Sequence, residues 1–254
     1  MKQRILSAIV MVAVCLYPLL FGGWSLMVLV CFCTLTAGYE LVKMISKDRF
    51  NILVYFLYLF FMAIAAYDKS KLPALIPLFL MVLYAISIFD KDFSLQDACL
   101  MLSMYIVLAK TVQGFIFIYN TNKLLIIYIL LAAFVCDAAA YFCGMAFGKH
   151  KLNERISPKK TIEGSIGGWI FAFAISFAFA YFNNFFGFGK LIFAINSIVL
   201  PLAGMIGDLA FSLIKRTYGI KDYGNLIPGH GGVLDRIDSL CFCLMLFVAI
   251  VGLL

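Results

Sequence analysis

Apolar runs long enough to cross a lipid bilayer follow one another along nearly the whole of this 254-residue chain. A bilayer-spanning helix needs roughly 17–25 consecutive apolar residues, and only short polar clusters interrupt the runs here. Hydrophobic residues make up 65% of the sequence and charged residues 13%, about half the charged share of an average soluble domain. The sequence therefore excludes a soluble globular fold and predicts an integral membrane protein.

Breaking the sequence at its polar clusters predicts nine membrane-spanning helices. Only helices and closed barrels satisfy every backbone polar group in hydrocarbon, and apolar runs without alternation exclude a barrel. The predicted fold class is thus all-α, a polytopic integral membrane protein. We divide it into a scaffold of N-terminal helices over 1–125, where dimerisation is expected, and C-terminal helices with cytoplasmic catalytic loops over 126–254. The predicted spans are 5–21, 24–46, 51–67, 72–89, 97–119, 124–147, 164–183, 189–214 and 236–254.

The distribution of lysine and arginine predicts how the chain is oriented. With a cytoplasmic N-terminus, fifteen of the twenty Lys and Arg residues fall in inside segments. Only Lys69, Lys71, Lys123 and Lys190 fall outside, and Lys110 lies within the fifth span. This asymmetry follows the positive-inside rule and places the net charge of +7 where anionic lipids and nucleotides are found. We expect a multi-pass protein of the cell membrane with its active site facing the cytoplasm.

The N-terminus and the cysteines suggest neither a cleaved signal nor a redox site. The basic start leads into an apolar run without a small-residue cleavage site, so we expect a retained first span. All eight cysteines lie in apolar stretches, where they behave as small hydrophobes, and no disulfide is expected. The pairs Cys31/Cys33 and Cys241/Cys243 point to nearly opposite sides of a helix, which argues against metal binding by either pair.

Ionisable side chains inside the predicted spans are candidates for function because they are costly in lipid. Glu40 and Lys110 also fit a structural role, since such side chains can reach the interface near the end of a span. Asp137 lies among small residues that allow close helix packing, and both a site role and a buried structural hydrogen bond stay open for it.

Asp208 is the strongest of these candidates because of its neighbours on the same helix. Gly204, Asp208, Ser212 and Lys215 are spaced so that they form one stripe running toward the cytoplasmic end. A carboxylate, a hydroxyl and an ammonium group therefore line one wall, which is suited to binding a metal ion and phosphates.

Two predicted cytoplasmic loops, 148–163 and 215–235, are longer than the others. The charge of Ser157–Gly164 alone indicates an ordinary basic flank. The second loop ends in glycines around His230, and glycine amides before a helix N-terminus are typical of anion binding. Asp235 and Asp238, in the first turn of the last span, fit simple capping. Alternatively, Asp235 and Asp208 converge on Mg²⁺, which prefers oxygen ligands.

Taken together, these motifs resemble the signature of the CDP-diacylglycerol synthases, the phosphatidate cytidylyltransferase family. That signature reads S-x-x-K-R, K-D, H-G-G and D-R-x-D at the spacings found here, and the resemblance covers roughly residues 130–250. Gly207-Asp208, Ser157–Gly164 and the stretch from Asp137 to Gly148 are also similar to the family, whereas residues 1–125 match only in being hydrophobic. The matching residues are Ser212, Lys215, Arg216, Lys221, Asp222, His230, Gly231, Gly232, Asp235, Arg236 and Asp238.

The resemblance implies a reaction in which CTP and phosphatidate give CDP-diacylglycerol and pyrophosphate. It further implies Mg²⁺ as cofactor, with a second cation left open, a homodimer among membrane lipids, and no nucleic-acid partner. Asp208 and Asp235 would be the metal ligands, with Asp137 ranked behind them, and Lys215 and Arg216 would act with the two aspartates as catalytic residues. Substrate would be bound by Ser212, Lys159, Lys160, Lys221, Asp222, His230, Gly231, Gly232 and Arg236.

Two alternatives remain at this point. A relative that uses CTP with another lipid, such as a polyprenol kinase, would differ in acceptor and product. A transporter or channel could instead use Asp137, Lys110 and Asp208 to line a pathway, although such a protein has no need for the loop motifs, and the chain shows no internal repeat.

Overall fold

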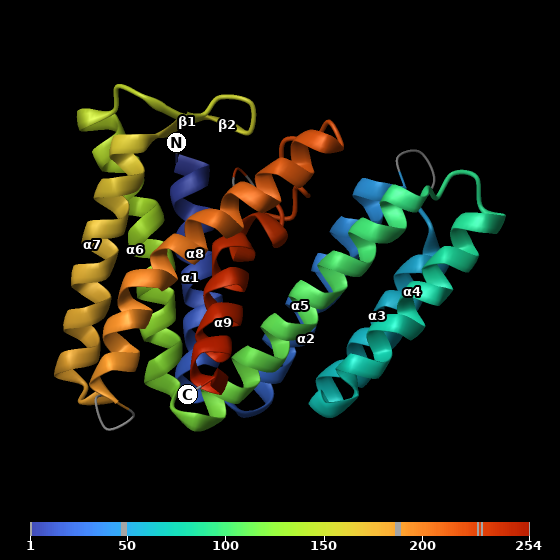
Figure 1. Cartoon of the computed structure of the whole chain (residues 1–254), viewed down its shortest axis with the longest axis horizontal. Coiled ribbons are helices and arrows are strands. Elements are labelled where there is room, and N and C mark those ends of the chain that lie inside the picture. Colours follow the sequence, from blue (N-terminus) through green and yellow to red (C-terminus); the bar gives the residue numbers. More distant parts are fainter. Residues whose placement is uncertain (1, 47–49, 186–188, 228, 230, 254) are drawn as a thin grey trace. The chain divides into compact units, whose positions relative to one another are not determined.

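The computed structural model describes residues 2–46, 50–185, 189–227, 229 and 231–253, and within these it consists of helices and one short hairpin (Figure 1). The helices are α1 (Lys2–Phe21), α2 (Gly23–Ile45), α3 (Ile52–Tyr67), the 3₁₀ helix η1 (Lys69–Lys71), α4 (Leu72–Phe89), α5 (Leu95–Thr121), α6 (Lys123–Phe147), α7 (Ile162–Phe182), α8 (Lys190–Thr217) and α9 (Leu234–Leu253). The strands are β1 (Lys151–Asn153) and β2 (Ser157–Thr161).

The prediction of an all-α polytopic membrane protein is confirmed. Each predicted span coincides with a helix, and the ends agree to within about three residues, which is ordinary scatter for such boundaries. Six segments among the described residues are long and apolar enough to cross a membrane, namely α2, η1 with α4, α5, α6, α7 and α8. The count of nine spans stays a prediction, because α1 and α9 are not among these six and α3 has only 16 residues, fewer than the usual spanning length.

The hairpin was not predicted from the sequence. β1 and β2 pair antiparallel, with Lys151 opposite Thr161 and Asn153 opposite Ser157. The Ile162 N–H also donates to the His150 carbonyl at 2.9 Å. The loop 148–163 is therefore an ordered hairpin standing between α6 and α7.

The helices form two compact units, neither of which is continuous in sequence. The first comprises the chain up to Gln113 together with 218–236, and the second comprises 114–217 with 237–254. This differs from the division at residue 125 drawn from the sequence. The physical reason is that residues of the long loop are hydrogen bonded to α2, as described below.

Aromatic rings from three helices form the core of the first unit. Phe61 of α3, Phe79 of α4 and Tyr105 of α5 are buried, with ring centroids 4.7 Å apart for Phe61–Phe79 and 4.8 Å for Phe79–Tyr105. The Gln113 side chain donates to the Ala65 carbonyl at 2.7 Å. The polar group is thus satisfied within the protein, as an apolar solvent requires.

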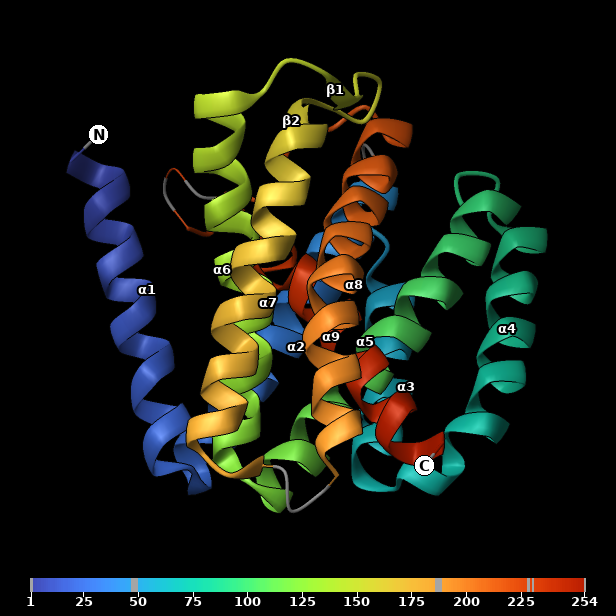
Figure 2. The same cartoon turned by 60° about the vertical axis from the view of Figure 1, so that its left-hand side comes forward.

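In the second unit, α6 and α7 pack backbone against backbone, and they lie side by side in both views (Figures 1 and 2). A Cβ at Gly164 would lie 2.6 Å from the Ala140 carbonyl oxygen, and one at Gly168 would lie 2.6 Å from that of Cys136. Small residues spaced four apart allow this approach. The close packing fixes where the hairpin between these two helices emerges.

α8 is attached to the same pair of helices by hydrogen bonds inside the second unit. The Trp169 indole on α7 donates to the Ile198 carbonyl at 2.8 Å. The Tyr128 hydroxyl on α6 lies 2.8 Å from the Ser197 hydroxyl. These contacts set the position of α8, whose C-terminal half carries Asp208.

Candidate active site

An ion pair between the hairpin and α8 forms the centre of the candidate site in the second unit. The Lys160 ammonium at the end of β2 contacts the Asp208 carboxylate, and the Ser212 hydroxyl donates to the same carboxylate at 3.4 Å. The Lys160 and Asp208 side chains are 28% and 21% exposed, so the pair is shielded but open to solvent. The structure thus brings together three residues that the sequence singled out.

Two further aspartates lie close enough to act on Lys160. Burial lowers the pKa of the Lys160 ammonium, and the negative charges of Asp137 and Asp238 oppose that shift. The Ser239 hydroxyl donates to Asp137 at 3.1 Å, and the Ser239 N–H donates to Asp238 at 2.7 Å. Lys215 on α8 is buried and adds positive charge near Lys160. Ser239 had no signal in the sequence analysis beyond its place next to the D-R-x-D motif.

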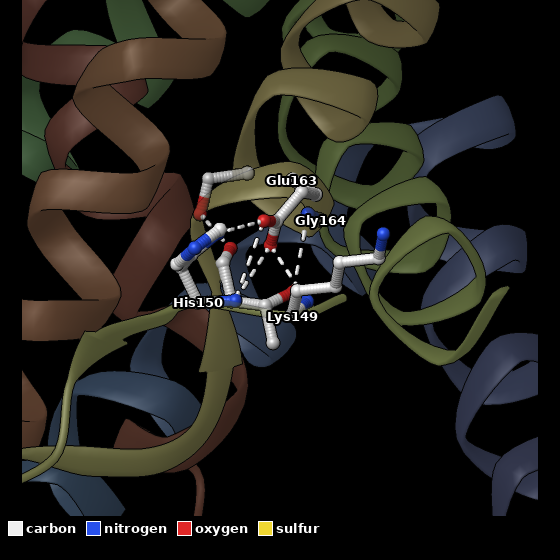
Figure 3. Close-up of polar contacts among 6 residues, drawn as sticks. Lys149, His150, Glu163 and Gly164 are labelled. Carbon is white, nitrogen blue, oxygen red and sulfur yellow. Dashed lines mark hydrogen bonds and ion pairs between the residues drawn. The ribbon is translucent and has the colours of Figure 1, made fainter. Parts of the chain in front are cut away.

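The base of the hairpin is closed by the Glu163 carboxylate, as Figure 3 shows. It accepts hydrogen bonds from the Lys149 N–H at 3.1 Å and the His150 N–H at 3.2 Å, and it lies 2.6 Å from His150 Nδ1. The Thr161 hydroxyl caps α7 by accepting the Gly164 N–H at 3.1 Å, the usual way to satisfy a helix N-terminus. Lys160 therefore extends from a hairpin whose two ends are fixed by the hydrogen bonds of Glu163 and Thr161.

The last turn of α8 reaches the same hairpin. The Arg216 side chain donates from Nε to the Ile156 carbonyl at 3.3 Å. Lys159 is exposed on β2, beside the paired Lys160. The hairpin thus contacts α8 at two places, through Lys160 at Asp208 and through the Ile156 carbonyl at Arg216.

In the first unit, Asp235 holds the long loop together. Its Oδ2 accepts the Tyr223 N–H at 2.8 Å and the Gly232 N–H at 2.9 Å, and the side chain is buried. Gly231 has a φ of 87° and lies against this carboxylate, since a Cβ there would be 2.7 Å from Oδ2 and 3.4 Å from the Asp222 Cβ. Only glycine suits this position.

Glu40 of α2 caps the same loop. Its two carboxylate oxygens accept the Val233 N–H and the Leu234 N–H, each at 2.9 Å, and the residue is 4% exposed. Glu40 is therefore a buried hydrogen-bond acceptor for the loop, which agrees with the structural role considered for it. The N-terminus of α9, where glycine amides suggested a phosphate, carries an anion from within the chain. A phosphate at this loop would therefore need donors other than the Val233 and Leu234 amides. In the sequence, the capping role of Glu40 was indicated only by its being an acidic residue within the second predicted span.

Several predicted residues lie apart from these contacts. Lys221, Asp222 and Arg236 are exposed, which suits them to meet a solute, and Lys110 is exposed on α5. His230 lies outside the described residues. Asp208 belongs to the second unit and Asp235 to the first, so their convergence on one cation stays a prediction.

The carboxylates in this region are the kind of ligand that a hard divalent cation prefers. Among the described residues, no three His, Cys, Asp or Glu side chains are grouped as a protein-only metal cage would be. Mg²⁺ commonly uses one or two carboxylates and completes its shell with water and substrate phosphates. Asp208, which contacts a hydroxyl and a cationic side chain, is suited to be one of those carboxylates.

Comparison with known proteins agrees with this chemistry. The model of the Cytidylyltransferase family matches residues 2–254. Proteins named phosphatidate cytidylyltransferase are similar along nearly their whole length: those of Staphylococcus haemolyticus and Staphylococcus aureus are 35% and 36% identical to this chain, and that of Staphylococcus saprophyticus is 34% identical. In each case the alignment covers 97% of both chains.

Proposed function

Since this chain belongs to the cytidylyltransferase family and is a nucleotidyltransferase, we propose that it catalyses the formation of CDP-diacylglycerol from CTP and phosphatidate. The observation that carries the proposal is identity of about a third over 97% of the chain to relatives with that activity in their names. Membership of an enzyme family also sets aside the transporter alternative. The chain is a multi-pass membrane protein, and we propose the cytoplasmic face of the cell membrane as the place of the reaction.

The reaction joins two anions. A phosphate oxygen of phosphatidate attacks the α-phosphorus of CTP, the bond from that phosphorus to the β-phosphate oxygen breaks, and pyrophosphate leaves with the electron pair. Two polyanions repel, so the site must supply positive charge before they meet. Catalysis of such a transfer is mainly positioning and charge stabilisation, and no protein nucleophile is required.

The residues of the candidate site are suited to these tasks. Lys160 and Lys215 in the second unit supply cationic groups near one another, and Asp208 orients Lys160 through their ion pair. Arg216, Lys159, Lys221 and Arg236 are the further candidates for binding phosphates. We propose that Asp208 and Asp235, with Asp137 ranked behind them, hold Mg²⁺, which when bound neutralises phosphate charge. A second cation and a homodimer remain part of the proposal.

The test is product formation by the purified full-length protein in lipid nanodiscs. With CTP, phosphatidate and Mg²⁺, we expect pyrophosphate and CDP-diacylglycerol in equal amounts, and neither product when phosphatidate or Mg²⁺ is omitted. Asp208→Asn is the matched control with strongly reduced activity. No CDP-diacylglycerol from folded protein would overturn the proposal.

The same assay separates the neighbouring lipid activity. A polyprenol kinase would transfer the γ-phosphate of CTP to a lipid alcohol and leave CDP in place of pyrophosphate. Supplying a polyprenol and measuring both by-products therefore distinguishes the two reactions. We expect pyrophosphate only, and only with phosphatidate.

A further inference from the structure

Three consecutive backbone amides at the start of α9 are held by two buried carboxylates. Gly232 donates to Asp235 at 2.9 Å, while Val233 and Leu234 donate to the two oxygens of Glu40 at 2.9 Å each. Glu40 lies on α2, more than 190 positions away in sequence. The motif segment at the start of α9 therefore depends on a helix that the sequence analysis treated as scaffold.

The fit between Glu40 and the loop is close on more than one side. A Cβ at Gly224 would lie 2.7 Å from Glu40 Oε1, and a Cβ at Gly232 would overlap the same oxygen. A side chain at either position would push the carboxylate away from the amides that donate to it. Such close packing is typical of the protein interior, whereas a side chain at the surface has open space on at least one side.

The start of α9 favours a hydrogen-bond acceptor with negative charge at this place. The first amides of a helix lack partners within the helix, and the helix N-terminus attracts negative charge. Hydrogen bonds from amides to a carboxylate are stronger than those to a neutral acceptor. With the Glu40 side chain buried, water is a poor substitute for it.

We propose that Glu40 is a positioning residue of the transferase, which fixes the start of α9 so that Asp235 and Arg236 are presented to the substrates in one orientation. This inference rests on the proposed function, since it gives a residue of α2 a role in that reaction. Glu40 acts through the loop amides and does not itself touch the substrates.

The experiment compares Glu40→Gln and Glu40→Asp with the wild type, as full-length protein in nanodiscs. The Gln side chain keeps its length but loses its charge and one acceptor, whereas Asp keeps the charge and loses reach. We expect kcat/KM to fall about tenfold or more for Gln, since 1.4 kcal/mol corresponds to a factor of ten, and by less for Asp. Asp92→Asn, an exposed acid in the α4–α5 connection, is the control and should match the wild type.

Hydrogen exchange separates positioning from general stability. In Glu40→Gln, exchange should rise in the peptide covering 231–236 and stay unchanged in the hairpin 151–161. Faster exchange everywhere, or unchanged exchange and unchanged kcat/KM, would overturn the inference. If the wild type makes no CDP-diacylglycerol, the proposed function fails, and the exchange result still decides whether Glu40 fixes the loop.

A double mutant tests the contact even if single variants are unstable. Gly232→Ala should be damaging because its methyl group collides with Glu40. Adding Glu40→Ala removes the collision, so the double variant should exchange and react no worse than Glu40→Ala alone, which is a non-additive result. Additive losses would contradict direct packing of Glu40 against residue 232.

Discussion

The ion pair between Lys160 and Asp208 gives two residues of the candidate site a joint role that neither shows alone in the sequence. Each residue, taken alone in the sequence, fits several roles, since a lysine in a basic loop and an aspartate in a span are both common. Their contact gives the pair a shared role, because the carboxylate orients the ammonium and the ammonium offsets a charge that lipid would not tolerate.

The first prediction concerns this pair. Lys160→Met and Asp208→Asn should each lower kcat/KM for pyrophosphate release by about 10²–10³, the range for losing one group that stabilises charge in the transition state. The double variant should be little worse than either single one, because the residues act as a unit.

Lys151→Gln, on the exposed part of the same hairpin, is the control for charge in general and should keep wild-type rates. Losses that multiply in the double variant would mean that the two side chains work independently.

At the scale of elements, the hairpin and the α6–α7 pair together position Lys160. The glycines that let α6 and α7 approach also set the distance between the hairpin's two ends, and Glu163 closes that base through the Lys149 and His150 amides. The direction in which Lys160 extends thus follows from helix packing as well as from the loop sequence.

The second prediction tests the helix packing. Gly168→Ala should destabilise the protein by about 1–3 kcal/mol, the usual cost of overpacking, because its methyl group would lie 2.6 Å from the Cys136 carbonyl oxygen. Thermal unfolding in detergent measures the effect. Gly252→Ala in α9 is the matched control, since no atom lies within 4 Å of the added group; equal midpoints for both variants would refute the packing argument.

The third prediction tests the hairpin base. Glu163→Gln removes the charge that two backbone amides and His150 share, so these hydrogen bonds lose their charge-assisted strength. We expect faster hydrogen exchange over 149–161 and a lower rate of product formation, since Lys160 loses its fixed position. Glu154→Gln, at the exposed hairpin turn, should change neither; an unaffected hairpin in Glu163→Gln would show that Glu163 is dispensable.

At the scale of the whole molecule, orientation in the membrane decides whether the site can work. Under the proposed function, CTP comes from the cytosol and phosphatidate from the membrane, so we expect the site to face the cytoplasm at the level of the lipid phosphate. The lysine and arginine asymmetry predicts this arrangement, with both motif-bearing loops on the inner side.

The fourth prediction tests that orientation in intact cells. Ser70→Cys, in a predicted outer segment, should react with a membrane-impermeant maleimide, while Arg155→Cys in the hairpin should react only after the membrane is permeabilised. The wild type gives the background from its eight native cysteines. Labelling of Arg155→Cys in intact cells would reverse the predicted topology.

The sequence by itself determined the membrane class and the helix positions, and it provided the candidate site residues. Hydropathy depends on local composition, so spans such as 72–89 coincide with α4, and the motif residues are recognised by spacing alone. The tertiary structure decided the partners. Glu40 meets Val233 and Leu234 across more than 190 positions, and Lys160 meets Asp208 across 48. Such pairings depend on how helices pack, and a pattern that repeats every few residues contains no record of them.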